Sequence, residues 1–212
     1  GQQINQYTID RTTFGDDDYY DVDYWDGATY QTAKIKGSVI RSAGSSSGLY
    51  AQTVVSATIN TVGEQSVVGT GVGGLSIPAD NFVVGDSYHG KIGGLINATG
   101  GGGRSEITIN IKAGSTILAT TGVFDLDTAT NQGWECELDF TIASIGAVGS
   151  ICTNGNFAYT KDGNRSVYGY IFQDVQPIDT TISNTLDVTV EWNVLNGGDD
   201  IYSANFVLYK TY

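Results

Sequence analysis

Apolar and polar residues alternate along most of this chain, and the alternation predicts β-strands. Strict period-two runs cover residues 107–111, 134–142 and 186–192. Because successive side chains of a strand point to opposite faces, each run gives one dry face and one wet face. No stretch of comparable length has the spacing of a helix. The pattern therefore predicts an all-β protein whose C-terminus lies inside a strand.

From Leu49 onward, turn residues interrupt the alternation at short intervals, and about ten strands are expected there. The expected strands cover residues 49–60, 66–70, 72–77, 86–97, 105–112, 115–121, 133–146, 149–160, 165–173 and 185–195, and 201–211 closes the chain. The Asp162-Gly163 pair supplies the positive φ that a tight hairpin needs. Many short strands without helices between them indicate a sandwich or a barrel, and irregular connections near 78–85 and 174–184 favour a jelly roll. We therefore predict an antiparallel jelly-roll sandwich.

The first 48 residues differ in composition from the rest of the chain. They contain an acidic and aromatic run at 15–27, an extended segment at 29–36 and a Gly/Ser stretch at 42–48 that has the composition of a flexible linker. This part is too short and too polar to bury a core of its own. We expect an N-terminal acidic/aromatic segment with its linker over 1–48 and the jelly roll over 49–212. The N-terminal segment is expected to pack on the main domain, pair with other chains or form the end of a stalk.

The charge balance excludes one class of partner. Acidic residues outnumber basic ones by 23 to 10, which gives a net charge of −13. Such a charge opposes phosphate backbones, so no nucleic-acid partner is expected. No apolar run approaches the ~18 residues of a membrane span, and no signal-peptide pattern is present, so no membrane insertion is expected. The chain has no Met and begins with Gly, and we therefore expect a fragment of a longer protein.

The two cysteines do not form a disulfide framework. Cys136 falls on the apolar face of its expected strand and is predicted to be a buried free thiol. Cys152 falls on the next expected strand, so a single bridge between the two stays open as an alternative. Neither cysteine has a His or a second Cys at metal-ligand spacing.

Two acidic segments carry the oxygen atoms that calcium prefers, the run at 16–26 and Asp125-Leu126-Asp127. In the first, Asp21, Asp23 and Asp26 miss the EF-hand spacing by one residue, and the later Glu is absent. A solvated acidic loop, whose Tyr and Trp side chains dock on a partner surface, accounts better for this run. We expect no metal and no cofactor, with calcium at 16–26 as the alternative.

No catalytic motif is present along the alternating pattern. Glu135, Glu137 and Asp139 share the wet face of one expected strand, at Cα spacings of ~7 Å. A glycosidase needs two carboxylates across a cleft, one of them with a raised pKa, whereas an open polar face keeps all three solvated. His89 is the only histidine, and no nucleophile elbow or Asp at a familiar spacing accompanies it. The sequence therefore predicts that the protein is not an enzyme.

Aromatic residues supply the candidate binding residues. The chain has 13 Tyr, and Tyr offers rigid amphipathic contact area at low entropic cost, which suits the recognition of sugars or proteins. Four tyrosines in loops or near strand ends are the candidates: Tyr159, Tyr168, Tyr170 and Tyr202. Packing in the core or at an interface is the alternative. Trp134 and Trp192 fall on apolar faces and are expected in the core.

Three parts of the chain resemble virion fibre and spike proteins of tailed phages and large DNA viruses. Residues 75–89 are similar to an "ipan-F-x-x-GD-s" segment of those proteins. Residues 179–192, with the ending 205–212, look like the closing strands of the same heads. Residues 17–27 resemble the short segment that is often found just before them.

The resemblance implies a C-terminal head domain with a tumour-necrosis-factor-like jelly roll, usually a homotrimer at the tip of a fibre on the virion surface. The family has no shared catalytic residues, and its receptor contacts lie in variable loops, so no binding residue follows from it. In the final strand, Phe206 and Leu208 alternate with Val207 and Tyr209, which makes both faces apolar. We expect this strand to be buried on both sides, either centrally in the sandwich or against a neighbouring subunit.

Two functions of different classes are expected from these observations. The first is a non-enzymatic, homotrimeric fibre or spike head that binds a host-surface receptor through multivalent attachment, with a glycan as one candidate receptor. The second is a monomeric carbohydrate-binding or lectin-like module of an extracellular bacterial protein. A third, least favoured, is a polysaccharide depolymerase with an unrecognised carboxylate pair. The molecular size in solution separates the first two.

Overall fold

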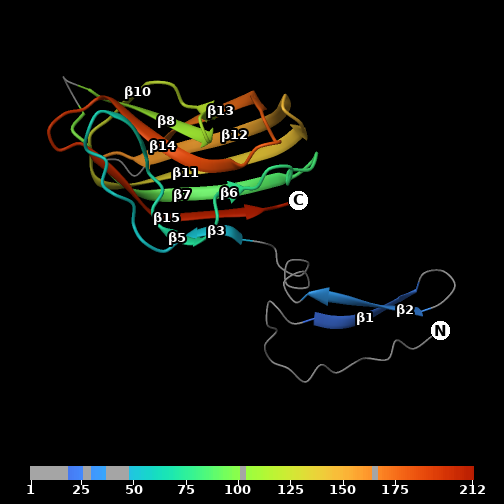
Figure 1. Cartoon of the computed structure of the whole chain (residues 1–212). Coiled ribbons are helices and arrows are strands. Elements are labelled where there is room, and N and C mark those ends of the chain that lie inside the picture. The colour runs from blue at the N-terminus through green and yellow to red at the C-terminus, as the bar shows by residue number, and fades with distance from the viewer. Residues whose placement is uncertain (1–18, 26–29, 37–47, 101–103, 164–166) are drawn as a thin grey trace. The chain divides into compact units, whose positions relative to one another are not determined.

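The computed structural model describes residues 19–25, 30–36, 48–100, 104–163 and 167–212 (Figure 1). The chain divides into two units, 1–47 and 48–212. In the first unit, β1 (Tyr19–Trp25) and β2 (Tyr30–Lys36) pair antiparallel as a two-stranded sheet. Most of the Gly/Ser stretch and part of the acidic run lie outside the described residues. The second unit contains the candidate site.

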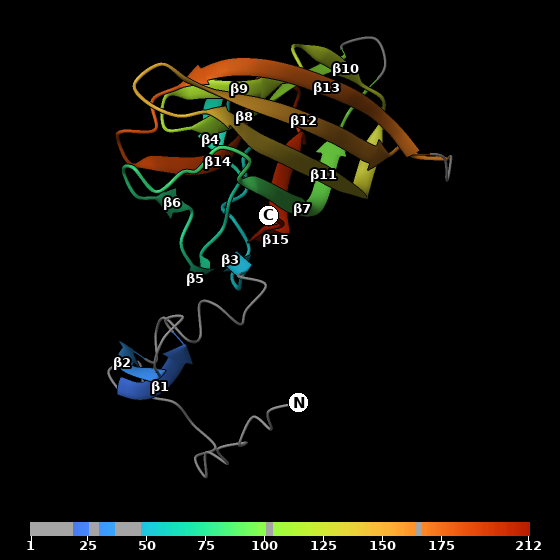
Figure 2. The same ribbon diagram turned by 90° about the vertical axis from the view of Figure 1, so that its right-hand side faces the viewer.

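The second unit consists of two antiparallel sheets, which confirms the predicted all-β antiparallel class and is consistent with a jelly-roll sandwich. The larger sheet has seven strands, in the order β13 (Val167–Ile178), β12 (Gly149–Thr160), β11 (Ala129–Ser144), β7 (Ser87–Ala98), β15 (Asp200–Lys210), β3 (Gly48–Gln52) and β5 (Gly71–Gly73). The smaller sheet has the order β10 (Phe124–Leu126), β8 (Ser105–Ala113), β14 (Asn184–Val194) and β6 (Ser76–Ile77), and β9 (Thr116–Thr120) also pairs with β8. Figure 2 shows β11, β12 and β13 running side by side, as their register requires.

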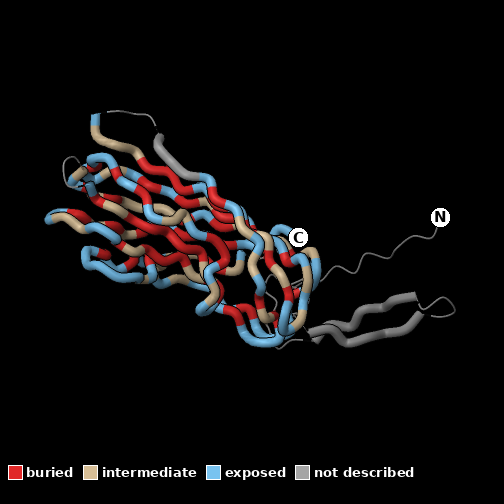
Figure 3. The backbone as a smooth tube through the Cα atoms, turned by 90° about the horizontal axis from the view of Figure 1, so that it is seen from above, coloured by how far each residue is buried: buried red, intermediate tan, exposed pale blue. Residues whose placement is uncertain are grey.

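The core lies between the two sheets, and buried residues alternate with exposed ones along long strands such as β11 (Figure 3). On β11 the even-numbered residues from Trp134 to Ile142 are all buried, as the alternation predicts. Phe124 of the smaller sheet and Phe157 of the larger sheet approach to 5.4 Å between ring centroids, so the two faces interdigitate. Trp192 is 1% exposed and donates its indole hydrogen to the carbonyl of Ile59 at 3.1 Å. The core placement expected for both tryptophans is therefore confirmed.

A strand expected at 49–60 is shorter in the structure. β3 ends at Gln52, and the adjacent Val54 and Val55 are both exposed, which breaks the alternation. The chain then bonds to the C-terminal strand through Ile59 and reaches the smaller sheet at Val62, which forms a bridge with Trp192. The segment therefore passes from one sheet to the other. β4 (Gly63–Ser66) follows and lies beside β14.

Both cysteines are free thiols, so the bridge left open by the sequence is not formed. β11 and β12 are neighbours, but Cys136 lies opposite Phe157 and Cys152 lies opposite Thr141. Cys136 faces the core and is completely buried, whereas Cys152 alternates to the other face of the sheet. Burial raises the pKa of the Cys136 thiol to about 12.

The segment that resembles fibre proteins closes a loop next to the C-terminus. Gly85 takes a positive φ of 94°, and the buried Asp86 carboxylate accepts a hydrogen bond from the amide of Val83 at 3.1 Å. The same carboxylate pairs with the ammonium group of Lys210 at 2.6 Å. Phe82 is buried in the core. The Phe, Gly and Asp of this segment therefore have structural roles.

Candidate functional site

The outer face of the seven-stranded sheet, which points away from the core, carries the residues with candidate chemistry. Three cross-strand rows cross β15, β7 and β11 in register, because the strands pair continuously there. The rows are Asn205–Gly93–Glu135, Val207–Lys91–Glu137 and Tyr209–His89–Asp139. These side chains come from positions up to 120 residues apart, and only the strand register brings them together.

The rows enclose a shallow depression of about 450 Å³, called here the central groove. His89, Lys91, Gly93, Glu135, Asn205, Val207 and Tyr209 line it from the outer face. Its volume lies within the range of small-molecule sites, although it is open to solvent rather than enclosed. The groove is set on strands, so its side chains are held by the sheet.

The charges in the groove are organised around Lys91. Its ammonium group pairs with Glu135 and with Glu137, each at 2.9 Å. The hydrogen bonds to Glu135 and Glu137 raise the pKa of Lys91, and Lys91 in turn lowers the pKa of Glu137. A glycosidase acid needs a carboxyl with a raised pKa, which is the opposite of the shift at Glu137. The two glutamates lie on the outer face, as the alternation predicts.

His89 is held by a carboxylate that the sequence analysis did not assign to it. Nδ1 of His89 lies 2.7 Å from Oδ1 of Asp139, and the imidazole packs against the ring of Tyr209 with centroids 5.2 Å apart. The two residues are 50 positions apart and meet only through the pairing of β7 with β11. This arrangement fixes the orientation of the imidazole.

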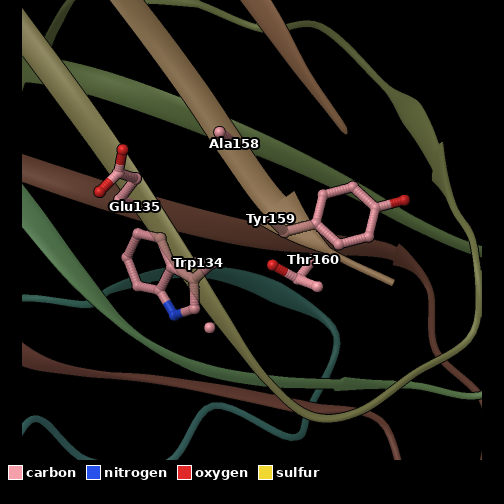
Figure 4. A pocket seen from close by; sticks show the side chains of 6 residues that line it. Trp134, Glu135, Ala158, Tyr159 and Thr160 are labelled. Atoms are coloured by element: carbon pink, nitrogen blue, oxygen red, sulfur yellow. The ribbon is translucent and has the colours of Figure 1, made fainter. Parts of the chain in front are cut away.

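A second depression of about 300 Å³ lies beside the central groove, between β11 and β12 (Figure 4). Gly133, Glu135, Ala158 and Thr160 line it from the outer face, and the strand residues Trp134 and Tyr159 complete it. Gly133 and Ala158 keep its floor low, because neither carries more than a methyl group. Glu135 lines both depressions and stands between them.

The four candidate tyrosines lie on three strands of the larger sheet, β12, β13 and β15. Tyr159 is 4% exposed and stacks on Phe157, and its hydroxyl accepts a hydrogen bond from the amide of Asp127 at 2.9 Å. Tyr168 lies opposite Tyr159 on β13, and Tyr170 also lies on β13, but the side chains of both fall outside the described residues. Tyr202 is half-buried on β15, which β11 and β7 separate from β12. Their role in binding stays a prediction.

The tyrosine that does line the groove is Tyr209, which the sequence analysis treated only as part of the final strand. β15 is an internal strand between β7 and β3, but this central place in the sheet does not bury both of its faces as expected. Phe206 and Leu208 face the core, whereas Val207 and Tyr209 are 38% and 37% exposed on the outer face. In the single chain the final strand is thus buried on one side only.

The acidic segments considered for calcium do not form a described metal site. Asp125 pairs with Arg104, and Asp127 pairs with Lys161 at 3.0 Å, so cationic side chains already contact both carboxylates. Among the described residues, no three His, Cys, Asp or Glu side chains gather as metal ligands. In the first unit, residues 16–18 and 26 lie outside the described ranges. Across the described ranges there is also no helix long and apolar enough to span a membrane.

Comparisons with protein-family models, with curated protein sequences and with solved structures found no match to this chain.

Proposed function

We propose that the chain is the head of a virion fibre or spike, which attaches to a host-surface receptor and does not catalyse a reaction. The observation that carries this proposal is the outer face of the seven-stranded sheet, where acidic, basic, amide and aromatic side chains line one open groove. Such mixed chemistry on a rigid surface suits the recognition of a ligand.

A homotrimer is part of this proposal, since several copies multiply the strength of a weak single site. Support comes from the end of the sheet next to the groove. A cross-strand row runs from Val72 on the edge strand β5 through Ala51 to Val207, and Val72 is 62% exposed. A neighbouring subunit that covers the edge strand β5 would remove the exposed Val72 side chain from water.

Light scattering coupled to size exclusion tests the trimer. A homotrimer of the 22.4 kDa chain has three times that mass, about 67 kDa. We expect that mass for the unmodified chain and a lower mass for Val72→Glu, which places a charge on the proposed contact. Val123→Glu is the matched control, because Val123 is 60% exposed and lies in the turn before β10. A 22 kDa species at micromolar concentration would overturn the fibre-head proposal.

The alternative function is a monomeric carbohydrate-binding or lectin-like module of an extracellular bacterial protein. One observation favours it: the central groove combines polar side chains with the exposed ring of Tyr209, which suits a saccharide. A monomer that binds a glycan at this groove would support the alternative over the fibre head.

A further inference from the structure

We infer that the central groove binds an uncharged saccharide chain rather than a sialylated or sulfated one. This inference rests on the proposed role of the protein as a binding head and names the ligand class of that head. It depends on three properties of the groove: its polar groups, its apolar surface and its charge.

The polar groups around the groove match the hydroxyl groups of a sugar. Glu135 is about half exposed and offers carboxylate oxygens, and the exposed Asn205 on the other side of Gly93 offers an amide that both donates and accepts. A sugar hydroxyl also donates and accepts, so it can bond to a carboxylate and an amide together. Glu135 and Asn205 lie on opposite sides of Gly93 in one cross-strand row, so a single ligand in the groove can contact both.

The apolar surface of the groove matches the carbon face of a pyranose ring. Tyr209 and Val207 are each more than a third exposed beside the polar groups, and the contact between Tyr209 and His89 limits the rotation of the tyrosine ring. An aromatic ring held in this way presents a large, rigid surface to a ligand. At the floor, a Cβ on Gly93 would lie 2.7 Å from the carbonyl oxygen of Trp134, so only glycine fits there and the floor stays low.

The charge of the groove selects against anionic ligands. Glu135 lines the groove, and Glu137 and Asp139 lie beside it on the same strand. The lysine of the groove, Lys91, is already shared between Glu135 and Glu137, and His89 contacts Asp139. The whole chain carries a net charge of −13. A carboxylate or sulfate on the ligand would therefore meet like charge in the groove and across the protein surface. A neutral sugar meets no such cost.

The two depressions favour a chain of sugars over a single unit. The central groove and the depression at Gly133 and Thr160 share Glu135, and together they cross the sheet from β15 to β12. A ligand that occupies both would contact Glu135 at its middle. We therefore expect an oligosaccharide to bind more tightly than its monosaccharide.

An array of neutral, sialylated and sulfated oligosaccharides, probed with the full chain, tests the ligand class. We expect binding to neutral oligosaccharides, with little change between low and high salt, because no ion pair with the ligand is involved. Calorimetry with the best neutral oligosaccharide then gives the affinity of each variant. Tyr209→Ala and Glu135→Ala should each weaken binding about tenfold, since each removes one side of the site.

Matched controls separate the groove from general effects on folding. Tyr212→Ala removes a tyrosine that lies outside the groove, and Glu106→Ala removes a glutamate on the smaller sheet, so both should leave the affinity unchanged. Tyr209→Phe keeps the ring and removes only the hydroxyl, and it should weaken binding less than Tyr209→Ala. Circular dichroism of each variant identifies any that fails to fold.

Three results would overturn the inference. They are a preference for sialylated or sulfated chains, full affinity in both groove variants, and no binding to any neutral oligosaccharide at millimolar concentration. These three results do not depend on the molecular mass of the protein in solution, which is the separate test of the fibre-head proposal. A monomer that binds neutral oligosaccharides at the groove would thus support this inference and favour the lectin-like alternative.

Discussion

Replacing Glu64 by Gln tests whether a hydrogen-bonded carboxylate stabilises the smaller sheet. Glu64 reaches from β4 across β14 to β8. Its carboxylate accepts hydrogen bonds from Lys112 Nζ at 2.8 Å, Thr189 Oγ1 at 2.6 Å and Asn110 Nδ2 at 3.0 Å. The hydrogen bond from Lys112, followed by that from Thr189, lowers the pKa of Glu64 from 4.5 to about 2. The folded state therefore favours the ionised carboxylate.

The size of the effect follows from this shift. One pKa unit corresponds to about 1.4 kcal/mol, so the whole shift corresponds to about 3 kcal/mol at neutral pH. One third of the Glu64 side chain is exposed, and the surrounding water screens part of the interaction. We therefore expect Glu64→Gln to lower the free energy of unfolding by about 1–2 kcal/mol at neutral pH.

Urea unfolding of both proteins at a series of pH values measures the effect. Because the folded pKa lies below the unfolded one, the contribution of Glu64 is complete above pH 4.5 and is lost as the pH falls toward about 2. The difference between the two proteins should shrink over this window. Glu106→Gln on β8 is the control, with an expected change below about 0.5 kcal/mol. A difference that stays constant down to pH 3, or that is absent at neutral pH, would refute the reasoning.

Three further predictions concern the reactivity of the two thiols, a tightly packed glycine and a buried hydroxyl. In the folded protein, Cys152 should react with a thiol reagent long before the fully buried Cys136, whereas both should react at once in urea; equal rates in the folded protein would contradict the burial of Cys136. Gly94→Ala should destabilise the fold by about 3 kcal/mol or more, because its Cβ would lie 2.0 Å from a backbone carbonyl oxygen, while Gly133→Ala has open space and should change the melting temperature little. Thr153→Val should stabilise the protein by about 1 kcal/mol in urea unfolding, since the buried Thr153 hydroxyl has no hydrogen-bond partner among the described residues. A loss of stability would show that this hydroxyl is satisfied.

The sequence was sufficient for the properties that depend on local periodicity. On β11, alternation alone predicted which residues are buried and which face outward, from Trp134 to Ile142. It predicted the boundaries of β12 at Gly149 and Thr160, because turn residues lie on both sides. Where the chain changed sheets without a Gly or Pro to mark the end of the strand, as it does after Gln52, the expected strand was too long.

The candidate site could not be assembled from the sequence, because it depends on register. Local periodicity places His89 on a strand and Asp139 on another, but it does not say that these strands pair or which residues face each other. Tyr209 was missed for a related reason. Alternation in the final strand indicated apolar residues on both faces, and only the sheet order shows that one face is exposed.

The separation of the two faces of β7, β11 and β15 has a consequence for the substitutions that this protein can accept during evolution. Odd-numbered positions of β11 from Gly133 to Asp139 line or flank the outer depressions, while the even-numbered positions between them fill the core. Under the proposed function, a substitution at an outward position would alter ligand preference with little effect on packing, and an inward one would do the reverse. Such a strand allows the outward residues to be exchanged one at a time while the core that supports them stays intact.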